Sequence, residues 1–84
     1  MDTQLKQWLM EKFAKSENFG GLLSLMKSNP ERVRKEFRYA IMFEWTEAYR
    51  RDTGRILAAG VDDAEELFSA VKEQYSKELA EITE

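Results

Sequence analysis

Carboxylate and hydroxyl groups are the natural candidates for chemistry in this sequence, because its 84 residues include no histidine and no cysteine. These two absences remove the commonest general base, the commonest ligand of transition metals and the thiol nucleophile. The pair Glu44-x-x-Glu47 lacks the histidine that di-metal bundles place in their Glu-x-x-His motif. The run from Asp62 to Glu66 lacks the alternation and the central glycine of a calcium loop. We therefore expect no catalytic site, no metal, no cofactor and no enzymatic activity.

Basic residues offer a different chemistry, the binding of phosphates. Four of them fall within seven positions: Arg32, Arg34, Lys35 and Arg38. On a helix, the last three share a face that continues toward Trp45 and Tyr49, and cations beside aromatic rings are typical of nucleic-acid grooves. Acidic residues interrupt the run, however, and the net charge of the chain is −3. A solvated face with i,i+4 ion pairs is therefore favoured, and nucleic-acid binding is the alternative function.

Apolar residues further along the same segment form two adjacent faces. The first contains Val33, Phe37, Ala40, Ile41 and Ala48, and the second contains Met42, Trp45 and Tyr49. A helix that is apolar over so wide an arc is usually central, so the favoured interpretation places Trp45 and Tyr49 in the core. The functional interpretation makes Met42, Trp45 and Tyr49 an exposed anchor for a protein partner.

Glu44 falls in the middle of the first apolar face when the segment is projected at about 100° per residue. An unpaired buried carboxylate is costly, so we expect Glu44 to have a cation or hydroxyl partner or else a raised pKa, and either Arg55 or a lysine of the first helix could reach it. The sequence therefore predicts that Glu44→Ala lowers the stability more than Glu47→Ala.

Negative charge is concentrated at the C-terminal end, where residues 56–84 contain eight acidic and two basic side chains. Glu65, Glu66 and Glu73 lie off the apolar stripe of this segment, so we expect them to be exposed. They could bind a basic protein partner, dock against the basic segment at 32–38, or remain solvated.

Helical periodicity dominates the elements that would position these residues. We expect helices over residues 4–15, 31–51 and 62–82, with a short apolar helix at 22–26 and a break at Gly20-Gly21. Asn29-Pro30 is a strong helix start and Gly54 a natural helix end. Asp62 or Asp63 could open the last helix, because each precedes a glutamate by three residues. No strand alternation occurs, so the sequence predicts an all-α fold.

The complete prediction is a single helical domain over residues 1–84. It is a compact bundle of three main helices and one short helix, with the 31–51 helix central. We expect a cytoplasmic location and no contact with a membrane, since no apolar run is long enough to span one. The expected function is that of a protein-binding module: a small adaptor, inhibitor or accessory subunit, such as a phage-encoded inhibitor of host machinery. A homodimer that packs Trp45 against its symmetry mate is a further hypothesis.

Overall fold

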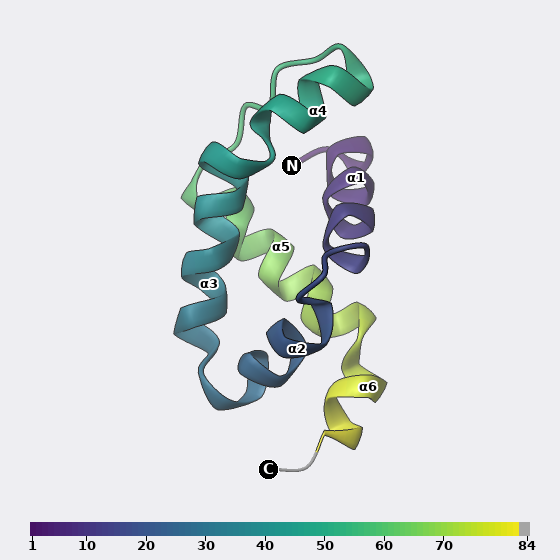
Figure 1. Cartoon of the computed structure of the whole chain (residues 1–84), viewed down its shortest axis with the longest axis vertical. Helices are drawn as coiled ribbons and strands as arrows, with labels where there is room; N and C mark the ends of the chain where they lie inside the picture. The colour runs from purple at the N-terminus through teal and green to yellow at the C-terminus, as the bar shows by residue number, and fades with distance from the viewer. Residues whose placement is uncertain (83–84) are drawn as a thin grey trace.

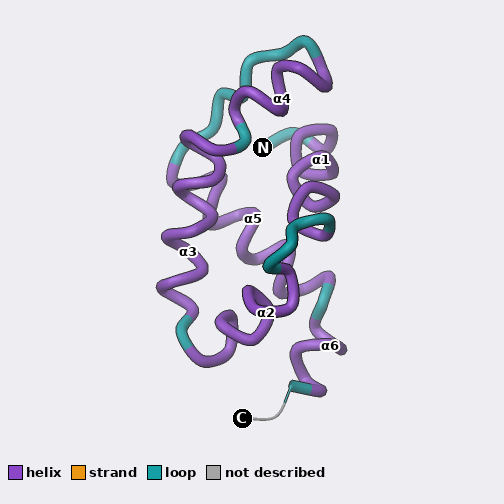
Figure 2. The backbone as a smooth tube through the Cα atoms, viewed as in Figure 1, coloured by secondary structure: helices purple, strands orange, loops and turns teal. Residues whose placement is uncertain are grey.

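Helices make up all the regular structure in the computed structural model, which describes residues 1–82 (Figures 1 and 2). The elements are α1 (Thr3–Ala14), α2 (Phe19–Ser28), α3 (Pro30–Tyr39), the π-helix η1 (Ala40–Glu44), α4 (Thr46–Thr53), α5 (Val61–Gln74) and α6 (Ser76–Glu81). The all-α prediction is confirmed. The prediction of three main helices and one short helix is wrong, because the described chain contains six α-helices and the π-helical segment.

The helices form an elongated body whose principal extents are 41, 22 and 19 Å. Helix α3, η1 and α4 make one bent column along the long axis, and α1 stands opposite that column (Figure 1). Helix α5 crosses behind both and packs against α1 and α3. Helices α2 and α6 contact each other at the other end of the body from α4. The column therefore has one face toward the other helices and one face toward solvent.

Local signals in the sequence set several of the helix ends as expected. The Asp2 carboxylate accepts a hydrogen bond from the Leu5 amide at 2.7 Å at the start of α1. The Asn29 side chain accepts one from the Arg32 amide at 3.3 Å, and Pro30 occupies the first turn of α3. Gly54 ends α4 with a φ of 73°, a conformation that glycine adopts without steric cost.

Two other boundaries differ from the predictions. Gly20 and Gly21 lie inside α2, so they do not interrupt the chain there. The predicted last helix starts earlier, at Val61, where the Asp63 carboxylate accepts a hydrogen bond from the Gly60 amide at 2.9 Å. It also leaves helical geometry at Tyr75 and resumes as α6. This break at Tyr75 separates α5, which packs on α1 and α3, from α6, which packs on α2.

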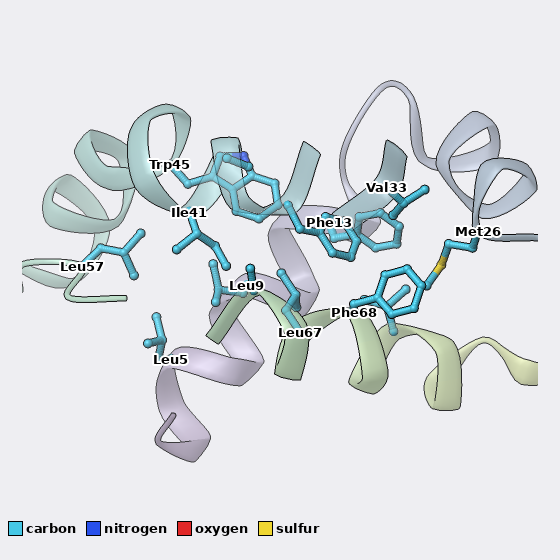
Figure 3. Close-up of a cluster of buried hydrophobic side chains, with 14 of the residues drawn as sticks. Leu5, Leu9, Phe13, Met26, Val33, Ile41, Trp45, Leu57, Leu67 and Phe68 are labelled. Carbon is cyan, nitrogen blue, oxygen red and sulfur yellow. The ribbon is translucent and has the colours of Figure 1, made fainter. Parts of the chain in front are cut away.

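One continuous hydrophobic core joins the helices (Figure 3). Phe13 of α1 meets Phe37 of α3 edge to face, with ring centroids 5.3 Å apart, and Phe37 in turn meets Phe68 of α5 at 6.3 Å. Each fully buried side chain of this kind contributes about 1.5–3 kcal/mol of transfer free energy. These ring contacts therefore hold α3, and with it the column, against both α1 and α5.

The middle of the predicted 31–51 helix is not an α-helix. The Trp45 amide donates to the Ala40 carbonyl oxygen, five residues back, at 2.7 Å. This pattern is that of a π-helix, which accommodates one more residue per turn than the standard i−4 bonding. The extra residue shifts the phase of everything after it, so Trp45 falls on the core side where Glu44 was expected.

Glu44 is exposed as a result, and its expected burial is wrong. Arg55, one of the cations proposed for it, is engaged elsewhere, because its guanidinium donates to the Gln4 side-chain oxygen at 2.9 Å. No polar or charged side chain is buried anywhere in residues 1–82. The π-helix thus removes the conflict that a regular α-helix would have created.

Candidate protein-binding surface

Trp45 and Tyr49, two of the predicted anchor residues, lie in the core. They are 8% and 5% exposed, and the Tyr49 ring meets Trp8 of α1 edge to face at 5.1 Å. In Figure 3 the Trp45 indole lies beside Ile41 and points into the hydrophobic cluster. The interpretation of both residues as core is confirmed. A dimer across Trp45 stays a prediction, and only a small part of that side chain is exposed to form it.

The exposed apolar surface of the column is formed by different residues, which we call the aromatic patch: Tyr39, Met42 and Phe43. These side chains are 58%, 47% and 64% exposed, although large apolar groups are usually covered. The Tyr39 and Phe43 rings are in contact, with centroids 5.4 Å apart and planes tilted by 46°. Met42 belonged to the predicted anchor set, whereas Tyr39 and Phe43 did not. The patch is therefore a paired aromatic surface centred on η1.

A simple signal in the sequence could have identified this pair. Tyr39 and Phe43 are four residues apart, which places them on one side of a helix. They also follow Phe37 by two and six residues, so they lie far from the Phe37 face in any helical projection. A projection at a constant angle places Trp45 and Tyr49 outside the first apolar face. The predicted second apolar face therefore contained those two residues and not Tyr39 and Phe43.

Charged residues continue the aromatic patch at both of its ends. Lys35, Tyr39, Phe43 and Glu47 follow one another at intervals of four residues and are all exposed. Arg38 lies beside Lys35 and is half-buried. Neither Lys35 nor Arg38 has an ion-pair partner within residues 1–82. The line therefore runs from cations, through aromatic rings, to a carboxylate.

The patch lies on helical backbone that is held at both of its sides. The Thr46 hydroxyl donates to the Phe43 carbonyl oxygen at 3.0 Å, at the point where the π-helix meets α4. The buried side chains of Ala40, Ile41 and Trp45 hold the opposite side of the same turn in the core. A partner would therefore meet a surface that needs little ordering.

Arg34 and Glu65, from two different predicted sites, bind each other. The Arg34 Nε donates to both Glu65 carboxylate oxygens at 3.0 and 3.1 Å, and its Nη1 donates to Glu31 at 2.8 Å. The guanidinium also lies over the Phe68 ring, 4.4 Å from its centroid. These carboxylates raise the pKa of Arg34 above its already high ordinary value. The pair joins α3 to α5, as expected if the acidic segment docks against the basic one.

The other predicted charged residues are dispersed. Arg32 pairs with Glu36 on its own helix at 3.4 Å. Glu66 accepts from the Met1 amino group at 2.9 Å and so raises the pKa of that amine. Glu73 is exposed on α5, two turns beyond Glu66. Glu65, Glu66 and Glu73 thus have three different surroundings, and Lys35 and Arg38 are the members of the basic set that the patch adjoins.

A surface cavity of about 430 Å³ lies between α1 and the column, with Lys12, Lys15, Glu36 and Glu44 among its lining residues. No three acidic residues of the described chain are placed to hold a metal ion. None of the helices in residues 1–82 is long and apolar enough to cross a membrane.

Comparison with known proteins gives no assignment, since no family model, curated protein or solved structure matches this chain.

Proposed function

We propose that this chain is a protein-binding module that acts by contact alone, as an adaptor, an inhibitor or an accessory subunit, and that the aromatic patch is its contact surface. The observation that carries the proposal is the exposure of three large apolar side chains together on one turn. Contiguous exposed apolar surface in a folded monomer usually marks an interaction site. Aromatic residues, methionine and arginine are also the types enriched in the buried centres of interfaces.

The π-helical backbone under the patch supports the same proposal. Such segments are rare and occur frequently at functional sites. Here the turn holds Trp45 in the core and presents Phe43 to solvent. A partner would gain the burial of both rings without ordering a loop, so that one cost of association would be absent.

Charges at the ends of the patch would supply orientation. Lys35 and Arg38 lie at one end and Glu47 at the other, in positions where partly exposed charges steer association and reject wrong partners. A nucleic acid is a poorer match to this surface. Arg32 and Arg34 are already paired with carboxylates, and Glu47 would repel phosphates.

Site-specific photo-crosslinking tests the proposal. A photoreactive phenylalanine analogue is placed at position 43 and, in a control, at position 56, where Ile56 is even more exposed but lies outside the patch. In the cells from which the chain comes, we expect a defined protein adduct from position 43 and none from position 56. Tyr39→Ser introduced together with the probe is expected to abolish the adduct. Equal labelling from both positions, or none from position 43, would reject the aromatic patch as the contact surface.

A further inference from the structure

The residues along the patch are arranged symmetrically about the level of Ile41. Tyr39 and Phe43 lie two residues before and after it. Lys35 and Glu47 lie six residues to either side and are both exposed. The two ends of this line of four residues therefore carry opposite charges. The surface is therefore complementary to a second copy of itself that runs in the antiparallel direction.

We propose that a second copy of this chain occupies the aromatic patch, with the two columns antiparallel about a twofold axis at the level of Ile41. This inference rests on the proposed function and names its partner. An isologous interface requires one patch to fit its own copy, so each contact occurs twice. Lys35 of one protomer then faces Glu47 of the other, and Tyr39 packs against Phe43. Met42, next to the axis, meets its own copy.

The charges also select the antiparallel arrangement over the parallel one. A parallel pairing would place lysine against lysine at position 35 and glutamate against glutamate at position 47, and such like-charge contacts oppose association. The same symmetry places Arg50 opposite Arg32, nine residues from the centre. Arg32 is paired with Glu36, whose carboxylate reduces the repulsion between the two arginines. The favourable pairs thus lie near the centre of the contact.

The size of the patch indicates a dimer that dissociates readily. The contact covers about four turns of one helix on each side, which places it with small, transient interfaces. A dimer contact at the patch also explains why apolar side chains remain at the surface of the monomer without a loop to cover them. We therefore expect a dissociation constant in the micromolar range.

Charge reversal and complementation test the antiparallel pairing directly. The full chain is measured by sedimentation equilibrium from about 5 to about 500 µM, a range chosen to span micromolar dissociation. The wild-type chain is expected to form dimers. Lys35→Glu and Glu47→Lys are each expected to weaken dimerisation about tenfold or more, because each change creates two like-charge contacts. Glu73→Lys, a reversal outside the patch, serves as the control and is expected to have no such effect.

An equimolar mixture of the two single variants gives the sharpest result. The Lys35→Glu chain is acidic at both positions and the Glu47→Lys chain is basic at both, so in the proposed geometry they complement each other. We expect the mixture to form heterodimers at least as readily as the wild-type chain dimerises, although each variant alone dimerises more weakly. Helical circular dichroism of each variant verifies that loss of the dimer is not loss of the fold.

Several results would overturn this inference. A wild-type chain that stays monomeric at the highest concentration would do so, as would a mixture that remains monomeric or a dimer that survives Phe43→Ser. The proposed function is judged separately by the crosslink from position 43. An adduct with a different protein, from a chain that is monomeric, would retain the contact surface and reject the second copy as its occupant. An adduct with the mass of two copies would support both.

Discussion

The Trp45 amide is bonded to the carbonyl oxygen of Ala40 at 2.7 Å, where an α-helix would have bonded it to Ile41. This one displaced hydrogen bond has consequences on both sides of the column. On the inner side, the indole of Trp45 enters the core and Glu44 stays in solvent. On the outer side, the tilted rings of Tyr39 and Phe43 are in contact, with their centroids 5.4 Å apart. The same turn therefore completes the core and builds the candidate binding surface.

The first prediction concerns Trp45, which the π-helix places in the core, and Glu44, which it leaves exposed. Trp45→Ala is expected to lower the free energy of unfolding by about 3–5 kcal/mol, because it leaves a cavity in the core. Glu44→Ala is expected to change it by no more than about 0.5 kcal/mol, the usual effect at an exposed position, and so to match Glu47→Ala. Urea unfolding of the three variants measures both effects. A large loss for Glu44→Ala alone would indicate a regular α-helix in this segment.

The second prediction uses deletions. Removing the exposed Met42 leaves Trp45 four residues after Ala40, which is the normal α-helical spacing. We expect this deletion to keep the fold and to change the stability by about 1 kcal/mol or less, as for other exposed sites.

Deletion of the exposed Lys35 is the matched control. It removes a residue from regular α-helix and rotates the flanking parts by about 100° relative to each other, so Phe37 and Val33 can no longer both face the core. We expect the Lys35 deletion to be unfolded and the Met42 deletion to melt cooperatively, as followed by circular dichroism. Equal damage from the two deletions would contradict the role assigned to the extra residue.

The third prediction concerns Arg34 as the link between α3 and α5. Arg34→Lys retains the charge but loses the two-oxygen contact with Glu65 and the stacking on Phe68, so we expect the melting temperature to fall by several degrees. Lys35→Arg, the converse change at the next position, is expected to leave it unchanged. A double-mutant cycle with Glu65→Gln should show coupling between Arg34 and Glu65 and none between Lys35 and Glu65.

The fourth prediction compares two glycines in different conformations. Gly20 lies in α2 with open space where a Cβ would be, so Gly20→Ala is expected to stabilise the protein by about 0.5–1 kcal/mol. Gly54 has a φ of 73°, so Gly54→Ala is expected to destabilise it by about 1–2 kcal/mol through backbone strain. Thermal unfolding of both variants checks the opposite signs, and a shift of the same sign in both would contradict the conformations of α2 and the α4 end.

The sequence alone determined those features that depend on neighbouring residues. The helix starts at Asp2 and Asn29-Pro30 and the helix end at Gly54 follow from side-chain caps and from glycine geometry within a few residues. The core faces of α1 and α5 follow from apolar residues at helical intervals, as Leu9 and Leu67 illustrate. These signals also determined the all-α class, because they act over one or two turns and need no distant partner.

The tertiary structure decided the features in which segments far apart in the sequence compete for the same space. A constant angle per residue would bury Glu44 and place Trp45 outside the first apolar face, yet burial of an unpaired carboxylate is costly and burial of an indole is favourable. The core formed by α1 and α5 decides between these registers, and the π-helix is the result. The contact between Arg34 and Glu65 spans 31 residues for the same reason. The aromatic patch lies on the outer side of the π-helix, so its position depends on how this segment packs against the core. The sequence pattern of the segment alone could not locate the patch.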